Sequence, residues 1–341
     1  MTPLDPAEIQ TLLVRLPNWL GDTVMALPAL RALRAGLATA EITLVGPWVE
    51  LFADQGVADQ VLTYPKSLPR RLAMSRRLRA MGRHDVLLLT NSLESALAAR
   101  SWGARRRIGF ATDGRGWLLT HPVTPPSPRR HQVDEYLELL RVFGVASNDS
   151  APRLSPSPGG GDERVDSLLG QAGASPDAAL VGLHLGAAFG PSKRWSIDRW
   201  VGLALALGSN GAHPILIGSP AEDSVAAEVC QRCPTPVASL VGRDSPAILP
   251  RLLGRFHLVI AGDTGVAHLA AALGVPVITL FGPTDPRLTA PRGARVRSIY
   301  KAVPCAPCFL VDCPINHPCM SGIGVDEVLE QASAFLKAAQ T

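Results

Sequence analysis

One stretch in the second half of the chain constrains the fold more than any other. An apolar run over residues 258–261 is followed by Asp263 and Thr264, and then by a helical pattern that ends near Leu273. A buried strand that passes into a helix across a short polar loop is the repeating step of an open α/β sheet. We expect Gly265 to let the backbone turn into that helix.

The start of this predicted helix suits an anion. The first N–H groups of a helix have no partner within it, and the helix dipole places partial positive charge at the same end. The loop formed by Asp263, Thr264 and Gly265 therefore presents donors that fit a phosphate or pyrophosphate. His268 lies one turn further along the same face. A second strand over residues 275–280 also ends in a polar turn, and adjacent strand ends of this kind bind nucleotides.

Strands and helices alternate through both halves of the chain, which predicts an α/β fold of two Rossmann-like, doubly wound parallel sheets facing a cleft. Residues 147–162 are rich in Pro, Ser and Gly, a composition typical of a linker. We expect an N-terminal domain over residues 1–160, a C-terminal domain over residues 161–323 and a closing helix over residues 324–341. The expected strands cover residues 11–16, 41–45, 60–63, 85–90, 107–110, 179–185, 213–217, 258–261 and 275–280.

Length and hydropathy narrow the class of protein. At 341 residues the chain is long enough for two domains with their own cores. No apolar run reaches the 18 or so residues that span a bilayer. The first ten residues lack the basic and apolar regions of a signal peptide, so we expect a cytoplasmic protein.

Charge separates the two halves. The net charge is +4, and the first 150 residues hold 18 Lys and Arg against 14 Asp and Glu. The arginines gather in three groups, at residues 70–83 on a predicted helix, at residues 105–107 and at residues 129–130. Guanidinium groups favour phosphate and carboxylate partners, although a solvated helix face explains any one group more simply. Because aromatic residues make up only 5% and no binding motif is present, nucleic acid is not expected as a partner.

The loop after the first strand holds a single carboxylate, Asp22. It lies at the carboxyl end of that strand, where α/β folds place their sites, and it can serve there as a general base. The alternative is that Asp22 caps a helix that starts at Thr23, a common role for Asp. Partial burial by Trp19 and Leu20 would restore basicity to a carboxylate beside a helix N-terminus.

Two loops in the second half carry further candidates. Residues 186–195 form a glycine-bounded loop whose Lys193 and Arg194 can clamp a phosphate, with Trp195 packed beneath them. The alternative is an exposed loop in which Lys193 and Arg194 bind no ligand. Glu222 follows the strand over residues 213–217, at a position where an acid accepts from a ribose diol. An acid favoured at a helix start explains Glu222 equally well.

Four cysteines near the C-terminus form a C-x2-C-x4-C-x5-C pattern: Cys305, Cys308, Cys313 and Cys319, with His317 among them. Sulfur ligands this close together suit Zn²⁺ or an iron–sulfur cluster. The second pair does not repeat the two-residue spacing that a zinc ribbon would have. The alternatives are a loop packed around its cysteines and disulfides that form in air. We expect no metal at these cysteines.

Four stretches, in this order, resemble one enzyme family. They are LPNWLGDTVMALPALRAL (16–33), GAAFGPSKRWSIDRW (186–200), GDTGVAHLAAALGVPVITLFGPTDP (262–286) and CAPCFLVDCPINHPCM (305–320). Together they resemble the ADP-heptose:lipopolysaccharide heptosyltransferases of glycosyltransferase family nine, and the second and fourth are most similar to the type II branch. Some relatives carry threonines where this chain has Ala187, Ala188 and Phe189, so hydroxyl contacts from that loop are not carried over.

The resemblance implies the two-domain GT-B architecture, with the acceptor held by the N-terminal domain and the ADP-sugar by the C-terminal one. It implies that Asp22 is the general base and that Lys193 contacts the diphosphate or the heptose. It also implies a set of residues that bind the nucleotide sugar: Glu222, Asp263, Thr264, Gly265 and His268.

The activity implied is inverting transfer of L-glycero-D-manno-heptose from ADP-heptose to the heptose/Kdo inner core of lipopolysaccharide, with no cofactor. The expected partners are ADP-heptose and an acceptor of Kdo-lipid A bearing heptose, with peripheral contact at the inner face of the inner membrane. The alternatives are a type I or type III transferase of the same family, a non-catalytic nucleotide-sugar-binding protein, or a metal–sulfur redox protein built on the cysteine segment.

Overall fold

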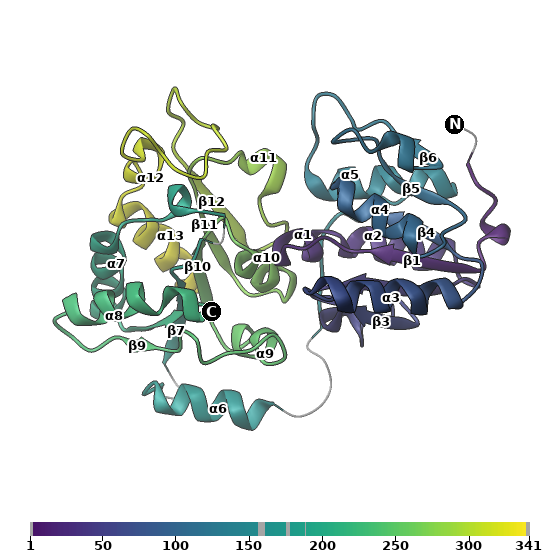
Figure 1. Ribbon diagram of the computed structural model, residues 1–341. Coiled ribbons are helices and arrows are strands. Elements are labelled where there is room, and N and C mark those ends of the chain that lie inside the picture. The colour runs from purple at the N-terminus through teal and green to yellow at the C-terminus, as the bar shows by residue number, and fades with distance from the viewer. Residues whose placement is uncertain (1–2, 156–160, 175–177, 188, 339–341) are drawn as a thin grey trace. The chain divides into compact units, whose positions relative to one another are not determined.

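The computed structural model describes residues 3–155, 161–174, 178–187 and 189–338. The chain divides into two compact units, Met1–Pro152 and Arg153–Thr341, and each unit is a parallel sheet covered by helices (Figure 1). The predicted α/β class with two doubly wound sheets is therefore confirmed. Of the predicted linker, residues 147–155 contain no helix or strand, residues 156–160 lie outside the described part, and Asp162 already begins a helix.

The first unit contains six parallel strands in the order β3-β2-β1-β4-β5-β6. Their bounds are β1 (Thr11–Arg15), β2 (Glu41–Gly46), β3 (Gln60–Thr63), β4 (Asp85–Leu88), β5 (Arg107–Phe110) and β6 (His121–Val123). The register places Arg15 beside Val45 on one side and Leu88 on the other. Because the winding reverses between β1 and β4, the carboxyl ends of these strands form the switch point at which such sheets bind ligands.

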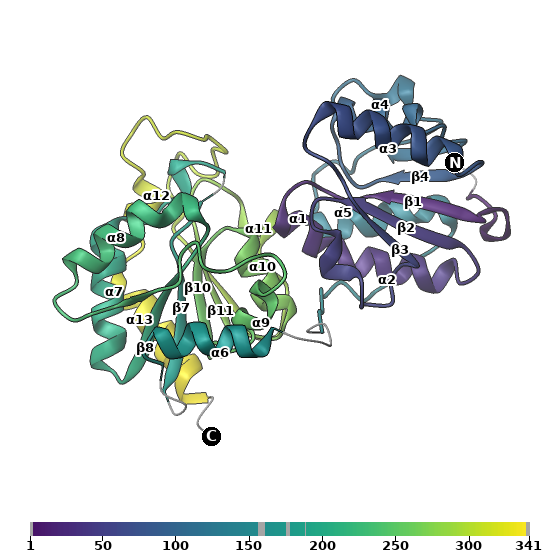
Figure 2. The same cartoon turned by 60° about the horizontal axis from the view of Figure 1, so that its bottom comes forward.

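Helices cover both faces of this sheet. They are α1 (Leu20–Met25), α2 (Leu27–Gly36), α3 (Leu68–Ala80), α4 (Leu93–Ser101) and α5 (Gln132–Leu139), with 3-10 turns η1 (Pro6–Glu8), η2 (Val49–Phe52), η3 (Gly116–Leu118) and η4 (Leu140–Phe143). Figure 2 shows α3 and α4 on one face and α2 on the other. The chain restarts its helix at Leu27, because Pro28 has no N–H to continue the hydrogen bonds of α1.

The second unit repeats the winding of the first, in the order β12-β11-β10-β7-β8-β9. Its strands are β7 (Ala179–His184), β8 (Ala212–Ile217), β9 (Ala238–Ser239), β10 (Leu258–Gly262), β11 (Val277–Phe281) and β12 (Val296–Tyr300). Here the switch point lies between β7 and β10, where His184 pairs with Ala261 at the carboxyl ends of both strands. All residues of β10 and β11 are buried, as the strands of a doubly covered parallel sheet must be.

The helices of this unit begin directly after the polar loops. They are α6 (Asp162–Gln171), α7 (Ile197–Ser209), α8 (Asp223–Arg232), α9 (Leu249–Leu253), α10 (Gly265–Ala272), α11 (Pro286–Thr289), α12 (Pro318–Ser321) and α13 (Val325–Ala338), with 3-10 turns η5 (Pro191–Lys193) and η6 (Pro220–Glu222). Trp195 packs edge to face on Trp200 at 5.0 Å and donates to the Ile323 carbonyl at 3.1 Å. The prediction that Trp195 packs beneath the loop is confirmed.

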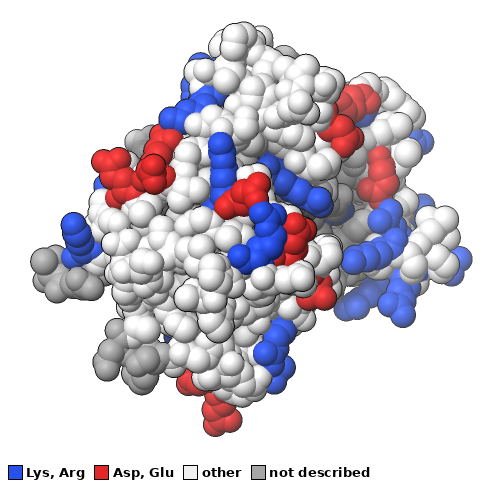
Figure 3. Space-filling model, turned by 90° about the vertical axis from the view of Figure 1, so that its left-hand side faces the viewer, with Lys and Arg blue, Asp and Glu red and all other residues white. Residues whose placement is uncertain are grey.

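Three strands were not predicted from the sequence: β6, β9 and β12. All three lie at sheet edges, and most of their side chains are partly or fully exposed. An edge strand covered on one face or less carries a weak apolar pattern, which explains why the periodicity does not mark them. On the face of the molecule seen in Figure 3, positive and negative side chains lie next to one another near the centre. Among the described residues, no helix combines the length and apolar content that crossing a membrane requires.

Candidate functional site

One carboxylate joins three loops of the second unit. Asp263 Oδ2 accepts hydrogen bonds from Lys193 Nζ at 2.5 Å and from Thr284 Oγ1 at 2.7 Å. Asp263 follows β10, Lys193 lies in the loop after β7, and Thr284 lies in the loop after β11. These loops meet at the carboxyl edge of three neighbouring strands, where parallel sheets place their ligand contacts.

The ion pair between Lys193 and Asp263 is largely buried, with side-chain exposures of 10% and 8%. Charges this far from water are stable only when they are paired and hydrogen-bonded. Lys193 Nζ also lies 3.4 Å from the main-chain oxygen of Asp263 and 4.7 Å from the centre of the Phe189 ring, a favourable cation–π distance. The ammonium group of Lys193 is therefore held in a fixed position beside Asp263, which lies two residues before the start of α10.

No described side chain caps the N-terminus of α10. Thr264 is the N-cap, with extended φ of −139° and ψ of 161°, but its side chain does not cap the helix. The Ala267 N–H, the third donor of the helix, donates to the Thr264 carbonyl at 3.1 Å. The N–H groups of Gly265 and Val266 are therefore the donors that an anion can meet. Gly265 is the first helical residue and lacks a positive φ, so the expectation that a glycine is needed there for the turn is wrong. His268 lies buried one turn further on, 5% exposed.

His184, which we did not predict from the sequence, lies at the centre of this edge. It ends β7, and its Nδ1 lies 3.5 Å from Thr264 Oγ1. Burial lowers the pKa of His184 to about 4, against the raising effect of the Glu222 charge, so the ring is neutral at pH 7. A Cβ on Gly186 would come within 2.8 Å of His184 Cε1 and 3.0 Å of Glu222 Cδ, so only glycine fits at position 186.

Glu222 forms a capping box with Ser219. Its Oε2 accepts from the Ser219 backbone N–H at 2.8 Å and from Ser219 Oγ at 2.6 Å, and this fixes the start of the next helix. Glu222 therefore has the local role at a helix start that the sequence allowed for it. The carboxyl group of Glu222 lies near Gly186 and His184, at the edge of the same site. Its contact with a ribose stays a prediction.

Asp22 does not cap a helix, contrary to one of the two interpretations of the sequence. It is the third residue of α1, whose N-cap is Trp19, because the chain is already extended at Trp19 and helical from Leu20. Thr23 Oγ1 donates to the Pro17 carbonyl at 3.1 Å and ties this loop to the helix. Asp22 is partly buried, as expected, and Trp19 is itself 59% exposed.

The surroundings of Asp22 come from α5, which packs against α1. Burial, followed by the charges of Asp22 and Glu135, raises the pKa of Tyr136 well above its usual value. Arg129 donates to both carboxylate oxygens of Glu135 at 3.1 and 3.0 Å, and Asp22 is among the charges that raise the pKa of Arg129. Asp22 therefore lies in a charged, partly buried environment, where a carboxylate can take up a proton from a bound hydroxyl group.

Two buried arginines at the carboxyl edge of the first sheet were also not predicted from the sequence. Arg15 ends β1, is 1% exposed and donates to Asn18 Oδ1 at 2.7 Å. Arg115 is fully buried, donates to the Phe110 carbonyl at 2.9 Å and to Ser95 Oγ at 3.0 Å, and burial lowers its pKa to about 10. Single arginines give no periodic signal, so the sequence did not distinguish these two from surface cations.

The cysteine segment packs on the loop that holds Thr284, since the backbone N–H groups of Cys308 and Phe309 donate to the Pro283 carbonyl at 3.0 and 2.9 Å. All six cysteines are free thiols, and burial raises the pKa of Cys319. Among the described residues, no group of three or more His, Cys, Asp or Glu side chains is placed to hold a metal ion.

Six of the seven predicted site residues lie in the second unit, and Asp22 lies in the first. The second unit brings Lys193, Asp263 and Thr264 together at one edge, with His184 and Thr284 added to them. Of the loop residues noted above, Ala188 lies outside the described part. Two doubly wound sheets, with polar loops gathered at the switch point of one, define an α/β protein of the class that binds ligands at this edge.

Residues 71–318 match the sequence profile described as "Glycosyltransferase family 9 (heptosyltransferase)". The chain belongs to this family and is a glycosyltransferase, as the resemblance implied. It is similar to lipooligosaccharide heptosyltransferase 2 of Campylobacter jejuni, with 25% identity over 95% of this chain and 98% of that protein. It is also similar to lipopolysaccharide heptosyltransferase 2 of Escherichia coli K12, with 26% identity over 83% and 86%.

The fold agrees with solved structures of the same family. The structure of E. coli ADP-heptose lps heptosyltransferase II matches with a TM-score of 0.81 and 24% identity, over 97% of this chain and 100% of that one. A glycosyltransferase family 9 protein from Veillonella parvula matches with a TM-score of 0.82 and 20% identity, over 99% of each chain. The predicted similarity to the type II branch is thus confirmed.

Proposed function

We propose that this enzyme transfers L-glycero-D-manno-heptose from ADP-heptose to the heptose/Kdo inner core of lipopolysaccharide, with inversion at the anomeric carbon. Relatives named heptosyltransferase 2 match over most of its length. The observation that carries the proposal is the Lys193 ammonium group, fixed by Asp263 beside the N-terminus of α10. A fixed cation next to unused backbone donors is suited to a diphosphate.

The donor would bind along the carboxyl edge of the second sheet. Lys193 and the first N–H groups of α10 would hold the diphosphate, and Asp263, Thr264 and His268 would contact the heptose and the pyrophosphate. Glu222 would accept from the ribose hydroxyl groups while keeping its bond to Ser219. The neutral His184 ring would support Thr264 without adding a charge next to the sugar.

The reaction would be a single displacement. A hydroxyl oxygen of the acceptor forms the new bond to the anomeric carbon of the heptose, its proton passes to Asp22, and the bond from that carbon to the ADP oxygen breaks. Lys193 and the α10 terminus meet the charge that develops on the departing ADP, an effect of about 3–4 kcal/mol per key donor. General base assistance from Asp22 would add roughly 10²–10⁴-fold.

The acceptor is a lipid, so we propose that the enzyme works at the inner face of the inner membrane through peripheral contact. The arginine-rich first unit supports this assignment, because anionic leaflets attract basic surfaces.

A transfer assay tests the proposal directly. Purified enzyme is incubated with ADP-heptose and a panel of truncated lipopolysaccharide acceptors, beside Asp22→Asn and the exposed control Asp54→Asn. We expect transfer to an acceptor that ends in one heptose, loss of at least about 10²-fold in Asp22→Asn with ADP binding retained, and normal transfer in the control.

The other outcomes identify the alternatives. Transfer only to an acceptor without heptose, or only to a longer core, would indicate a type I or type III acceptor preference. Binding of ADP-heptose without transfer to any acceptor would leave a nucleotide-sugar-binding protein and would contradict the proposed reaction.

A further inference from the structure

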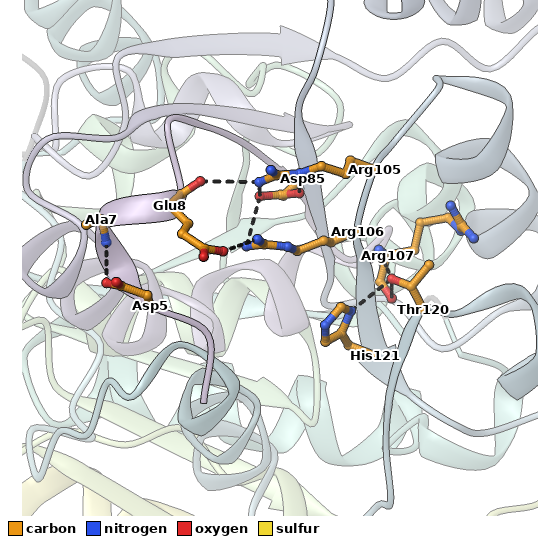
Figure 4. A network of polar contacts seen from close by, with 9 residues as sticks. All are labelled: Asp5, Ala7, Glu8, Asp85, Arg105, Arg106, Arg107, Thr120 and His121. Atoms are coloured by element: carbon orange, nitrogen blue, oxygen red, sulfur yellow. Dashed lines mark hydrogen bonds and ion pairs between the residues drawn. The ribbon is translucent and has the colours of Figure 1, made fainter. Parts of the chain in front are cut away.

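In two of the three arginine groups of the first unit, four of the five arginines pair with acids. Arg105 binds the Asp85 carboxylate through Nε at 3.1 Å and through a terminal nitrogen at 2.9 Å, and Arg106 pairs with Glu8 and lies 3.8 Å from Asp85 (Figure 4). Arg129 binds Glu135 in the same two-pronged way. These arginines have structural partners, so they do not need an external anion.

The arginines of α3 differ from both groups. The sequence of α3 is LPRRLAMSRRLRA, which contains five arginines and no acid. Arg71 pairs with Glu94, but Arg70, Arg76, Arg77 and Arg79 form no ion pair with any described residue. All four are exposed, because α3 turns only a narrow stripe that includes Met74 and Leu78 toward the core. A block of unpaired positive charge is left on the outer face of the helix.

Large apolar side chains are exposed next to these arginines. They are Leu68 and Leu72 on α3 (67% and 52% exposed), Leu93 and Leu97 on α4 (42% and 46%), and Trp117 on η3 (70%). Helix α3 packs against α4, and α4 against η3. Arg71 reaches Glu94 at 3.3 Å and Ser75 Oγ lies 2.9 Å from Ser101 Oγ, so the helices are joined at both ends of α4.

We propose that this region binds the surface of an anionic lipid bilayer. The region is named the α3–α4 surface and comprises Leu68, Leu72, Leu93, Leu97, Trp117, Arg70, Arg76, Arg77 and Arg79. The arginines attract anionic headgroups, while the leucines and the tryptophan enter the boundary between headgroups and acyl chains. The inference rests on the proposed function only in that the acceptor is a lipid, and it assigns the membrane contact to particular side chains.

The chemistry of the surface favours a bilayer over other anionic partners. Nucleic acid would leave the four leucines against a polar backbone, and the surface offers Trp117 alone for stacking. A second copy of the chain would oppose one block of arginines with another. A bilayer satisfies both features at once, because its charged and apolar layers lie a few ångströms apart.

Vesicle co-sedimentation of the full-length protein tests the inference, without ADP-heptose or acceptor. The vesicles contain phosphatidylglycerol in phosphatidylcholine, or phosphatidylcholine alone. We expect binding to the anionic vesicles only, reduced about tenfold or more in Arg76→Glu/Arg77→Glu. The matched control Arg164→Glu/Arg295→Glu makes the same charge change at exposed arginines of the second unit and should bind within about twofold of wild type, since those arginines lie outside the surface.

A second variant separates lipid insertion from simple charge attraction. Leu97→Ser/Trp117→Ser should bind several-fold more weakly, and the deficit should persist at high salt, which screens only the charge contribution. Ile315→Ser, an exposed apolar control in the second unit, should bind as wild type. Circular dichroism and ADP binding of each variant verify folding.

The inference is overturned if the α3–α4 variants bind vesicles like their controls, or if the wild-type protein binds a DNA duplex but no anionic vesicle. Its outcome is independent of the transfer assay. Vesicle binding without transfer would contradict only the proposed reaction, and transfer to a detergent-solubilised acceptor without vesicle binding would contradict only this surface.

Discussion

At the scale of single residues, the site depends on groups that satisfy one another. Asp263 needs Lys193 because a carboxylate 8% exposed is costly without a cation, and Lys193 is positioned by the same bond. The sequence placed both residues in a phosphate site without indicating that they touch. It missed Thr284 and His184, whose only signal was a polar residue at or just after the end of an apolar strand.

Replacing Lys193 should damage activity far more than an ordinary surface lysine would. We expect Lys193→Ala to lower kcat by about 10²–10³-fold, because the charge on the departing ADP loses a fixed partner. Steady-state kinetics measure the effect. Lys301→Ala, which breaks the half-exposed pair with Glu327, is the control and should keep normal kcat. Equal behaviour of the two variants would contradict a role for Lys193 in the reaction.

His184 should make stability depend on pH. Its pKa is about 4 in the folded protein and near 6.5 when unfolded, so between these values only the unfolded state binds the proton. The free energy of unfolding therefore falls as pH drops from 6.5 to 4, by up to about 3 kcal/mol, and is insensitive to this residue above 6.5. Denaturant titrations of wild type and His184→Gln at pH 7 and pH 5 measure it. An identical loss in both proteins would show that His184 is not responsible.

The glycine at position 186 should be irreplaceable for a steric reason. We expect Gly186→Ala to weaken ADP binding about tenfold or more, because its Cβ would displace His184 or Glu222. Gly170→Ala in α6 meets no atom within 4 Å and should stabilise the protein by about 0.5–1 kcal/mol. Calorimetric titration with ADP compares them, and normal ADP binding by Gly186→Ala would refute the steric argument.

At the scale of elements, the apolar pattern predicted every central strand and missed three of the four edge strands. Central strands such as β10 are buried on both faces, so their sequences are continuous apolar runs that can be recognised alone. Edge strands such as β12 need a neighbour to define them, and their exposed residues carry no such pattern. The start of α1 was misplaced for a similar reason, since the backbone of Trp19, rather than the Asp22 side chain, sets it.

The position of β4 should depend on the buried carboxylate that begins it. Asp85 is 1% exposed and accepts from Arg105, with Arg106 nearby (Figure 4). We expect Asp85→Asn to lower the free energy of unfolding by about 2–3 kcal/mol, because the partly buried guanidinium groups lose their counter-charge. Asp198→Asn, in a highly exposed pair with Arg232, should leave the free energy of unfolding nearly unchanged. Urea denaturation distinguishes them, and equal losses would refute the argument.

At the scale of the whole molecule, the chain consists of two units with the same winding, and the predicted site residues other than Asp22 all lie in one of them. ADP should therefore protect the second unit selectively. At 100 times its Kd, ADP should stabilise the folded protein by about 2.7 kcal/mol. Hydrogen exchange should slow in the loops after β7 and β10, and protection confined to the first unit would contradict the assignment.

The sequence by itself determined the α/β class, the two sheets, the family and the loops that carry the site. It could do so because buried strands and glycine-rich loops are local patterns, readable a few residues at a time. Only the tertiary structure decided which side chains meet: the Lys193–Asp263 pair joins residues 70 apart, and Arg105 and Arg129 bind carboxylates while most arginines of α3 do not. Such partnerships depend on the order of strands in the sheet, a long-range property that no local pattern contains.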